Sequence, residues 1–197
     1  MSIGRDSITG VVLAGGLGRR MSADGQGTDK GLVTWRGQPL VAHAIARLAP
    51  QVASLLVNAN RSLDDYRRFG RPVIADAIDG FAGPLAGVAS ALRAAETPWV
   101  LSVPCDSPLL PTDLAERLGA AAIECGTRVA VARTPDGAQP VFLLVARSLE
   151  PHLSAWLTAG GRKIDAWYRE LDPAFADFAD ASAFRNINTR EDLDALR

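Results

Sequence analysis

Short apolar runs alternate with helical stretches over residues 8–103, and this alternation constrains the fold more than any other feature of the chain. Runs rich in Val, Ile and Leu predict buried strands at residues 8–14, 52–57, 72–75 and 99–103. The spacing of apolar and polar residues predicts helices between them at residues 40–48, 62–69 and 85–95. Because strand, helix, strand units form right-handed crossovers, we expect an α/β fold with a mostly parallel sheet and helices on both faces.

The rest of the chain adds further helices and a strand pair. Helices are expected at residues 111–123, 148–157, 163–169 and directly after Thr189. Thr112 or Asp113 can cap the first, and Thr189 with Asp192 can form a capping box on the last. Strands are expected at residues 128–132 and 140–145, around the turn Pro135-Asp136-Gly137, and at residues 175–178. No repeat or low-complexity linker divides the chain, so we expect a single domain over residues 1–197.

The composition excludes several classes of function. Hydrophobic residues make up 48% of the chain and its net charge is −1, so no overall positive field is available to bind nucleic acid or an anionic membrane. We expect neither as a partner. A short polar N-terminal segment and the lack of a long apolar run predict a cytoplasmic protein. Cys105 and Cys125 lack the spacing of a zinc site, and we expect both to be reduced thiols that pack inside the protein.

Polar or glycine residues follow four of the predicted strands. These residues are Gly15-Gly16, Asn58, Asp76 and Asp106. In open α/β sheets, ligands bind beyond the carboxyl ends of the strands. The sequence therefore predicts a binding site where these four strands end.

The segment from Leu13 to Met21 is rich in glycine and carries two arginines. Glycines after a buried strand let backbone N–H groups approach a phosphate or a base closely. The segment lacks the GxxxxGK[ST] pattern of a P-loop, and Met21 stands where GxGxxG would need its third glycine. The residues alone leave two interpretations open, an anion-binding loop and a structural turn.

Asp106 and Lys30 are the two charged candidates. Asp106 lies between Pro104 and Pro108 directly after a strand, where oxygen ligands for Mg²⁺ are commonly placed. The alternative is a turn aspartate that bonds its own backbone. Lys30 follows the polar residues 22–29, and the alternative for Lys30 is a solvated surface charge. His43 and His152 have no ligand or nucleophile at a suitable spacing, which predicts structural roles.

Taken together, these residues resemble the molybdenum cofactor guanylyltransferases, within the nucleotidyltransferases that share an LAxGxxxRM signature. The matching segments, in chain order, are Leu13-Ala14-Gly15-Gly16 through Arg20-Met21, Asp29-Lys30-Gly31-Leu32, Val57-Asn58-Ala59-Asn60-Arg61, Gly83-Pro84-Leu85-Ala86-Gly87, Pro104-Cys105-Asp106-Ser107-Pro108 and Asn186-Ile187-Asn188-Thr189. They span nearly the whole chain. Residues 22–28 depart from the family, because the loop before Asp29-Lys30 is several residues longer than is usual there.

The resemblance implies a three-layer Rossmann-like nucleotidyltransferase fold and an enzyme that transfers GMP from GTP to the phosphate of molybdopterin, releasing pyrophosphate. It implies Mg²⁺ as cofactor, held by Asp106, with Arg20 and Lys30 on the triphosphate. The nucleotide-binding residues would be Leu13, Ala14, Gly15, Gly16, Lys30, Asn58, Asp76 and Asp106. The residues on the pterin side would be Gly83, Gln139, Arg162, Lys163, Asn186 and Asn188. Molybdoenzymes or cofactor-insertion proteins would be partners.

Three alternative functions stay open. Two are enzymes of the same superfamily, a molybdopterin cytidylyltransferase and a sugar-phosphate nucleotidyltransferase. The third is a noncatalytic module that senses nucleotides. The pairing of Gly15 with Gly16 favours the guanylyl enzyme, and the intact Asp106 turn counts against the sensing module, which needs no metal.

Overall fold

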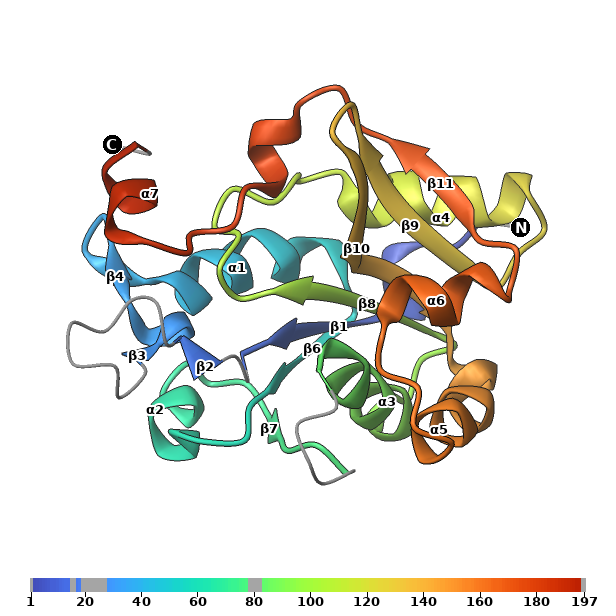
Figure 1. Ribbon diagram of the computed structural model, residues 1–197, viewed down its shortest axis with the longest axis horizontal. Coiled ribbons are helices and arrows are strands. Elements are labelled where there is room, and N and C mark those ends of the chain that lie inside the picture. The colour runs from blue at the N-terminus through green and yellow to red at the C-terminus, as the bar shows by residue number, and fades with distance from the viewer. Residues whose placement is uncertain (1, 15–16, 19–27, 78–82, 196–197) are drawn as a thin grey trace.

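The computed structural model describes residues 2–14, 17–18, 28–77 and 83–195, and its centre is a seven-stranded sheet (Figure 1). The strand order is β11-β9-β10-β8-β1-β6-β7. The strands are β1 Ile8–Leu13, β6 Ser54–Asn58, β7 Val73–Ile74, β8 Trp99–Pro104, β9 Val129–Thr134, β10 Gly137–Ala146 and β11 Ala174–Asp177. Only β10 runs antiparallel to its neighbours, β8 and β9, and every other pair in this sheet is parallel. The predicted mostly parallel sheet is confirmed.

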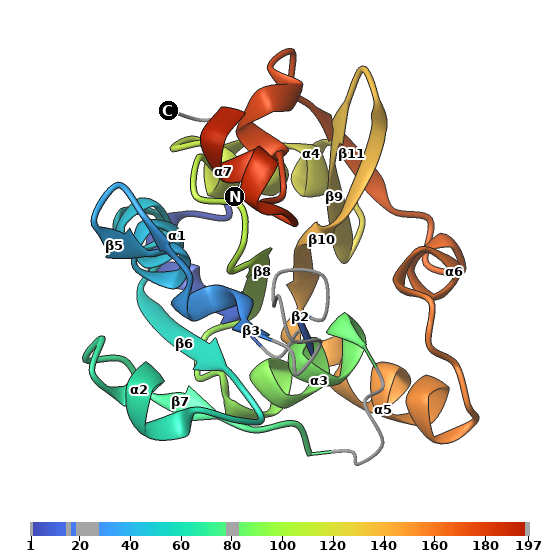
Figure 2. The same cartoon turned by 60° about the vertical axis from the view of Figure 1, so that its left-hand side comes forward.

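Helices cover both faces of the sheet, which gives three layers (Figure 1). Helices α1 Leu40–Leu48 and α4 Leu114–Glu124 pack on one face. Helices α3 Pro84–Ala94, α5 Glu150–Thr158 and α6 Ile164–Arg169 pack on the other. Two short helices, α2 Leu63–Arg67 and α7 Arg190–Ala195, lie near the ends of the strands (Figure 2).

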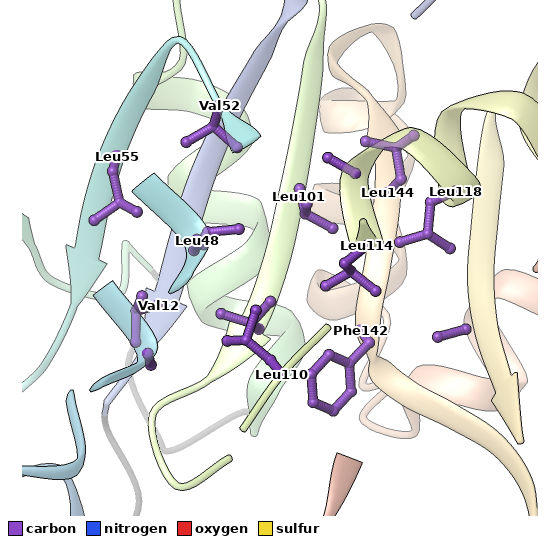
Figure 3. Close-up of a cluster of buried hydrophobic side chains, with 14 of the residues drawn as sticks. Val12, Leu48, Val52, Leu55, Leu101, Leu110, Leu114, Leu118, Phe142 and Leu144 are labelled. Carbon is purple, nitrogen blue, oxygen red and sulfur yellow. The ribbon is translucent and has the colours of Figure 1, made fainter. Parts of the chain in front are cut away.

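The apolar core is divided by the sheet because neighbouring strand residues point to opposite faces. Val12 and Leu101 belong to the cluster under α1 and α4, whereas Val11 belongs to the cluster under α3, α5 and α6. Figure 3 shows part of the first cluster, with Leu114 of α4 among the strand residues. Leu101 and Leu114 are fully buried, and each such side chain contributes about 1.5–3 kcal/mol to folding. This burial helps to hold α4 against the sheet.

Two cap predictions had different outcomes. Thr189 and Asp192 form the predicted capping box on α7, since Asp192 N donates to Thr189 Oγ1 at 3.2 Å and Thr189 N donates to Asp192 Oδ2 at 2.9 Å. Helix α4 begins at Leu114 rather than at residue 111. Asp113 stands at its N-cap position, but its side chain pairs with Arg117 at 3.5 Å instead of capping the helix.

Short elements surround the main sheet. Two small antiparallel ladders pair β2 Leu17–Gly18 with β3 Thr28–Asp29 and β4 Thr34–Trp35 with β5 Gln38–Pro39. A 3-10 turn, Lys30–Leu32, directly follows β3. Cys105 is buried as predicted, but Cys125 is exposed at the end of α4, so the packing prediction is wrong for Cys125. None of the helices among the described residues has the length and hydrophobicity needed to cross a membrane.

Strands β1, β6, β7 and β8 are parallel neighbours and end at the same side of the sheet, here called the carboxyl edge. In Figure 1 the arrowheads of β1 and β8 point left, toward β3 and α7. The described polar residues at the ends of these strands, Asn58, Asp76 and Asp106, therefore lie at the same edge, as the sequence predicts.

Candidate functional site

Asp106 is a buried carboxylate at the carboxyl edge, two residues after the end of β8. It is 9% exposed, and burial raises the pKa of Asp106 above its ordinary value while the nearby Lys30 ammonium opposes this shift. Lys30 Nζ lies 3.3 Å from Asp106 Oδ2. Burial thus favours the neutral acid form of Asp106, whereas the Lys30 ammonium stabilises the ionised form.

Lys30 joins two segments that lie far apart in the sequence. It begins the 3-10 turn after β3, and its ammonium donates to Asn188 Oδ1 as well as to Asp106 Oδ2. Its side chain is only 20% exposed. The alternative that Lys30 is a solvated surface charge is therefore wrong.

The segment before α7 is tied to the Asp106 turn by two further hydrogen bonds. Ile187 N donates to the Asp106 carbonyl oxygen at 2.8 Å, and Ser107 Oγ lies 2.6 Å from Asn186 Oδ1. These contacts bring the predicted pterin-side residues Asn186 and Asn188 to the carboxyl edge. Ser107 is a participant that sequence reasoning did not single out, although it lies in a quoted motif.

Asn58 and Asp76 form a second polar cluster, after β6 and β7. Asn58 Nδ2 donates to Asp76 Oδ1 at 2.9 Å, and Asn60 Nδ2 donates to Asp76 Oδ2 at 2.7 Å. Asn58 is 4% exposed, and it lies against Gly87 of α3, where an added Cβ would be 2.3 Å from Asn58 Oδ1. Gly87, the second glycine of the Gly83 to Gly87 motif, therefore makes room for Asn58 at the end of β6.

Leu13 and Ala14 connect the strand ends to one another. Ala14 N donates to the Asn58 carbonyl oxygen at 2.8 Å, and Cys105 N donates to the Leu13 carbonyl oxygen at 3.1 Å. The ends of β1, β6 and β8 are thus held in one arrangement. Three other predicted residues, Gly15, Gly16 and Arg20, lie outside the described residues.

The other pterin-side candidates are Gly83, Gln139, Arg162 and Lys163. Gly83 stands before α3 with φ of +72°, and Gln139 Nε2 donates to Thr134 Oγ1 at 3.1 Å across the β9–β10 hairpin. Arg162 Nη1 donates to the carbonyl oxygens of Leu157 at 2.8 Å and Gly161 at 2.7 Å, and Lys163 is exposed before α6. The contacts described for Gly83, Gln139, Arg162 and Lys163 do not reach Asp106 or Lys30.

Sequence reasoning missed Tyr66, a fully buried residue of α2. Its hydroxyl donates a hydrogen bond of 2.5 Å to Oδ1 of Asp29. Asp29 is the residue directly before Lys30. A lone tyrosine in a short polar helix carries no sequence signal for such a contact, because its partner lies 37 residues away.

The site offers oxygen donors that fit Mg²⁺. The described residues contain no group of three His, Cys, Asp or Glu side chains that could hold a metal by themselves. Asp106 supplies one carboxylate, and Mg²⁺ is commonly held by one or two carboxylates together with substrate phosphates. Asp106 suits that mode.

Both histidines make contacts with tryptophans. His43 Nε2 lies 2.9 Å from the Trp35 carbonyl oxygen, and His152 Nδ1 accepts a hydrogen bond of 3.1 Å from Trp167 Nε1. The predicted structural roles of both residues are confirmed.

Comparisons with known proteins identify the family to which the chain belongs. Residues 10–174 match the model of the MobA-like NTP transferase domain. The chain is 48% identical over 198 residues to a molybdenum cofactor guanylyltransferase of Ralstonia nicotianae, and the match covers 96% of this chain and 95% of the relative.

Solved structures share the fold at low sequence identity. One is titled molybdopterin-guanine dinucleotide biosynthesis protein A, from Archaeoglobus fulgidus, with a TM-score of 0.75, 22% identity and 95% of each chain covered. Another is a CMP:2-keto-3-deoxy-manno-octonic acid synthetase complexed with CTP, with a TM-score of 0.74, 12% identity and coverage of 98% of this chain and 96% of that chain.

Proposed function

Because this chain belongs to the MobA-like NTP transferase family, we propose that it is a molybdenum cofactor guanylyltransferase. It transfers GMP from GTP to the phosphate of molybdopterin, releases pyrophosphate and forms molybdopterin guanine dinucleotide. The observation that carries this proposal is the meeting of Lys30, Asp106 and Asn188 at the carboxyl edge. A cation beside a buried carboxylate suits the charge of a triphosphate and its metal ion.

The reaction needs little covalent chemistry from the protein. An oxygen of the pterin phosphate forms a bond to the α-phosphorus of GTP, and the bond from that phosphorus to the oxygen bridging to the β-phosphate breaks. Pyrophosphate leaves with the electron pair. The attacking phosphate is anionic near neutral pH, so no general base is required. The protein acts by positioning the two reactants and by stabilising the charge on the phosphate oxygens.

Each residue of the carboxyl edge has a role in this proposal. Asp106 holds Mg²⁺, and this ion, when bound, neutralises charge on the phosphates. Lys30 and Arg20 bind the triphosphate. Lys30 also opposes the rise that burial causes in the pKa of Asp106, which favours the ionised form that a metal ion needs.

The guanosine portion of GTP binds to the residues at the ends of β1, β6 and β7 in this proposal. Asn58 and Asp76 bind it, with backbone groups of Leu13 and Ala14 and of Gly15-Gly16. Two glycines beside a base permit close backbone approach, which supports recognition of guanine through its hydrogen-bonding edge.

The pterin phosphate binds mainly to residues from the second half of the chain in this proposal. Arg162 and Lys163 supply positive charge, and Asn186 and Asn188 supply amide groups next to Asp106. Gly83 and Gln139 complete this group of candidates.

The test is product identification with the full chain. Purified protein is mixed with GTP, MgCl₂ and molybdopterin, and pyrophosphate and the dinucleotide are followed by mass spectrometry. We expect both products in equal amounts. GTP binding without pyrophosphate release would instead support the noncatalytic sensing module, and turnover with a sugar phosphate in place of molybdopterin would support the sugar-phosphate enzyme.

A further inference from the structure

Tyr66 lies beneath the Lys30 turn, and its hydroxyl faces two segments of the carboxyl edge. Its side chain is fully buried, and α2, which carries it, lies beside β7 (Figure 2). The hydroxyl donates to Asp29 Oδ1 at 2.5 Å and lies 3.5 Å from the Ala14 carbonyl oxygen. One phenol therefore contacts both the end of β1 and the residue before Lys30.

The hydrogen bond to Asp29 is a strong one by its chemistry. A neutral O–H that donates to a carboxylate gives a short, charge-assisted hydrogen bond, roughly twice as strong as one between neutral groups. Burial, with added repulsion from Cys105 and the Asp29 hydrogen bond, holds the pKa of Tyr66 far above its ordinary value. The phenol thus keeps its proton and remains a donor.

Asp29 has a second anchor on its other side. Asp29 Oδ2 lies 3.5 Å from Arg61 Nε, so the carboxylate is held between α2 and the loop after β6. The backbone of Asp29 continues directly into Lys30. Fixing the carboxylate therefore limits where the Lys30 backbone can lie.

Gly31 shows how closely Tyr66 approaches this turn. A Cβ added at Gly31 would lie 2.4 Å from the Tyr66 hydroxyl oxygen and 3.2 Å from Cε1 of the ring. The residues on both sides of Lys30 are thus in contact with the same phenol. The Lys30 side chain leaves from a backbone that is fixed at Asp29 and at Gly31.

We propose that Tyr66 is a positioning residue that holds Asp29 and Gly31, and thereby sets the reach of the Lys30 ammonium to Asp106 and Asn188. The link to turnover rests on the proposed function of Lys30. The placement of Lys30 does not, and it can be measured without any substrate.

Amine labelling of the free protein is the first measurement. The chain has two lysines, so a reagent such as acetic anhydride, read out by peptide mass spectrometry, reports Lys30 and the exposed Lys163 separately. Tyr66→Phe keeps the ring and removes the hydroxyl. We expect the labelling rate of Lys30 to rise roughly tenfold, the shift that corresponds to losing one hydrogen bond to a charged group, with Lys163 unchanged.

Tyr168→Phe is the matched control for labelling. Tyr168 is the other tyrosine of the chain, buried in the core cluster on the opposite face of the sheet. Its replacement should leave the labelling of Lys30 unchanged.

Asp29→Asn is a second test variant. It keeps the size of the acceptor but removes its charge, and it should raise the labelling rate of Lys30 by a smaller factor than Tyr66→Phe does. Lys30 labelling at the wild-type rate in folded Tyr66→Phe and Asp29→Asn overturns the proposal.

A double-mutant cycle on turnover is the second measurement, made on proteins whose melts show that they are folded. Tyr66→Phe should lower kcat roughly tenfold in the wild-type background. In the Lys30→Ala background it should have no further effect, because the residue through which Tyr66 acts is gone. Equal losses in both backgrounds would show a merely structural role and overturn the proposal. Absence of turnover in the wild type would count against the proposed function alone, since labelling decides the role of Tyr66 independently.

Discussion

The two sides of the candidate site differ in how firmly they are held. Near Asp106, a hydrogen bond links Lys30 to Asn188, although these two residues lie 158 residues apart in the sequence. Another hydrogen bond links Asn58 to Asp76 across 18 residues. Arg162, by contrast, bonds only the carbonyl oxygens of its own turn, within five residues, among the contacts that the structure describes. The residues proposed for the nucleotide are therefore tied to distant segments, together with Asn188 from the proposed pterin side, and we call this group the organised side. Arg162 of the proposed pterin side bonds its own turn, and with the exposed Lys163 it forms what we call the open side.

The largest expected effect is on turnover at the organised side. Asp106→Asn replaces a carboxylate by a neutral amide, which is a poor ligand for Mg²⁺. We expect kcat to fall on the order of 10³-fold, as for loss of a principal group that stabilises transition-state charge. Pyrophosphate release at several Mg²⁺ concentrations measures it. A variant that keeps most of the wild-type rate at limiting Mg²⁺ would remove Asp106 from the metal site.

Asp76→Asn tests the second cluster on the same side. Asp76 accepts hydrogen bonds from the amides of Asn58 and Asn60, and an asparagine offers one acceptor oxygen where the carboxylate offers two. We expect the KM for GTP to rise roughly tenfold, with a much smaller change in the KM for molybdopterin. Initial rates over a grid of both substrates separate the two constants. Equal increases in both would mean that this cluster does not belong to the nucleotide alone.

Lys163→Ala tests the open side, where a smaller effect is expected. An exposed cation that meets a phosphate contributes on-rate and modest affinity, so the KM for molybdopterin should rise about threefold to tenfold and more strongly at low salt. The KM for GTP should stay constant. Thermal melts should match the wild type, because Lys163 is exposed before α6. An increase in the KM for GTP would show that Lys163 also affects nucleotide binding, and would contradict its assignment to the pterin side alone.

The smallest effect concerns the stability of the metal-free protein. Because burial raises the pKa of folded Asp106, the folded chain holds a proton that the unfolded chain releases, and stability falls as pH rises through this range. Asp106→Asn should therefore raise Tm at pH 7, by about 2–4 °C for each kcal/mol of cost removed. The gain should vanish below the ordinary pKa of an aspartate. Calorimetry with a chelator present checks this, and a lower Tm at pH 7 would show that the Lys30 ion pair outweighs the cost of burial.

Much of the fold follows from local sequence patterns. Helix α1 spans residues 40–48 as its apolar spacing predicts, and the capping box on α7 is readable from Thr189 and Asp192. Strand β6 begins at Ser54 rather than at residue 52, although Val52 is buried in the same cluster as Leu55 of the strand. The small ladders β2–β3 and β4–β5 could not be predicted, since strands of two residues have no periodicity.

The candidate site was predictable only in part. Parallel topology places Asn58, Asp76 and Asp106 at one edge, so those positions follow from the strand ends. The pairing of Lys30 with Asn188 and the contact of Tyr66 with Asp29 depend on how distant segments pack. No local pattern encodes such contacts, and only the folded chain reveals them.

The comparison of GTP with CTP tests the central claim most directly, because the fold is shared with a synthetase complexed with CTP. The values of kcat/KM for both nucleotides are measured on the wild type with molybdopterin at matched Mg²⁺. A polar site built for guanine leaves buried groups unpaired when cytosine binds, so GTP should be preferred by up to roughly 10⁴-fold. Equal use of GTP and CTP, or a preference for CTP, would contradict the guanylyltransferase assignment.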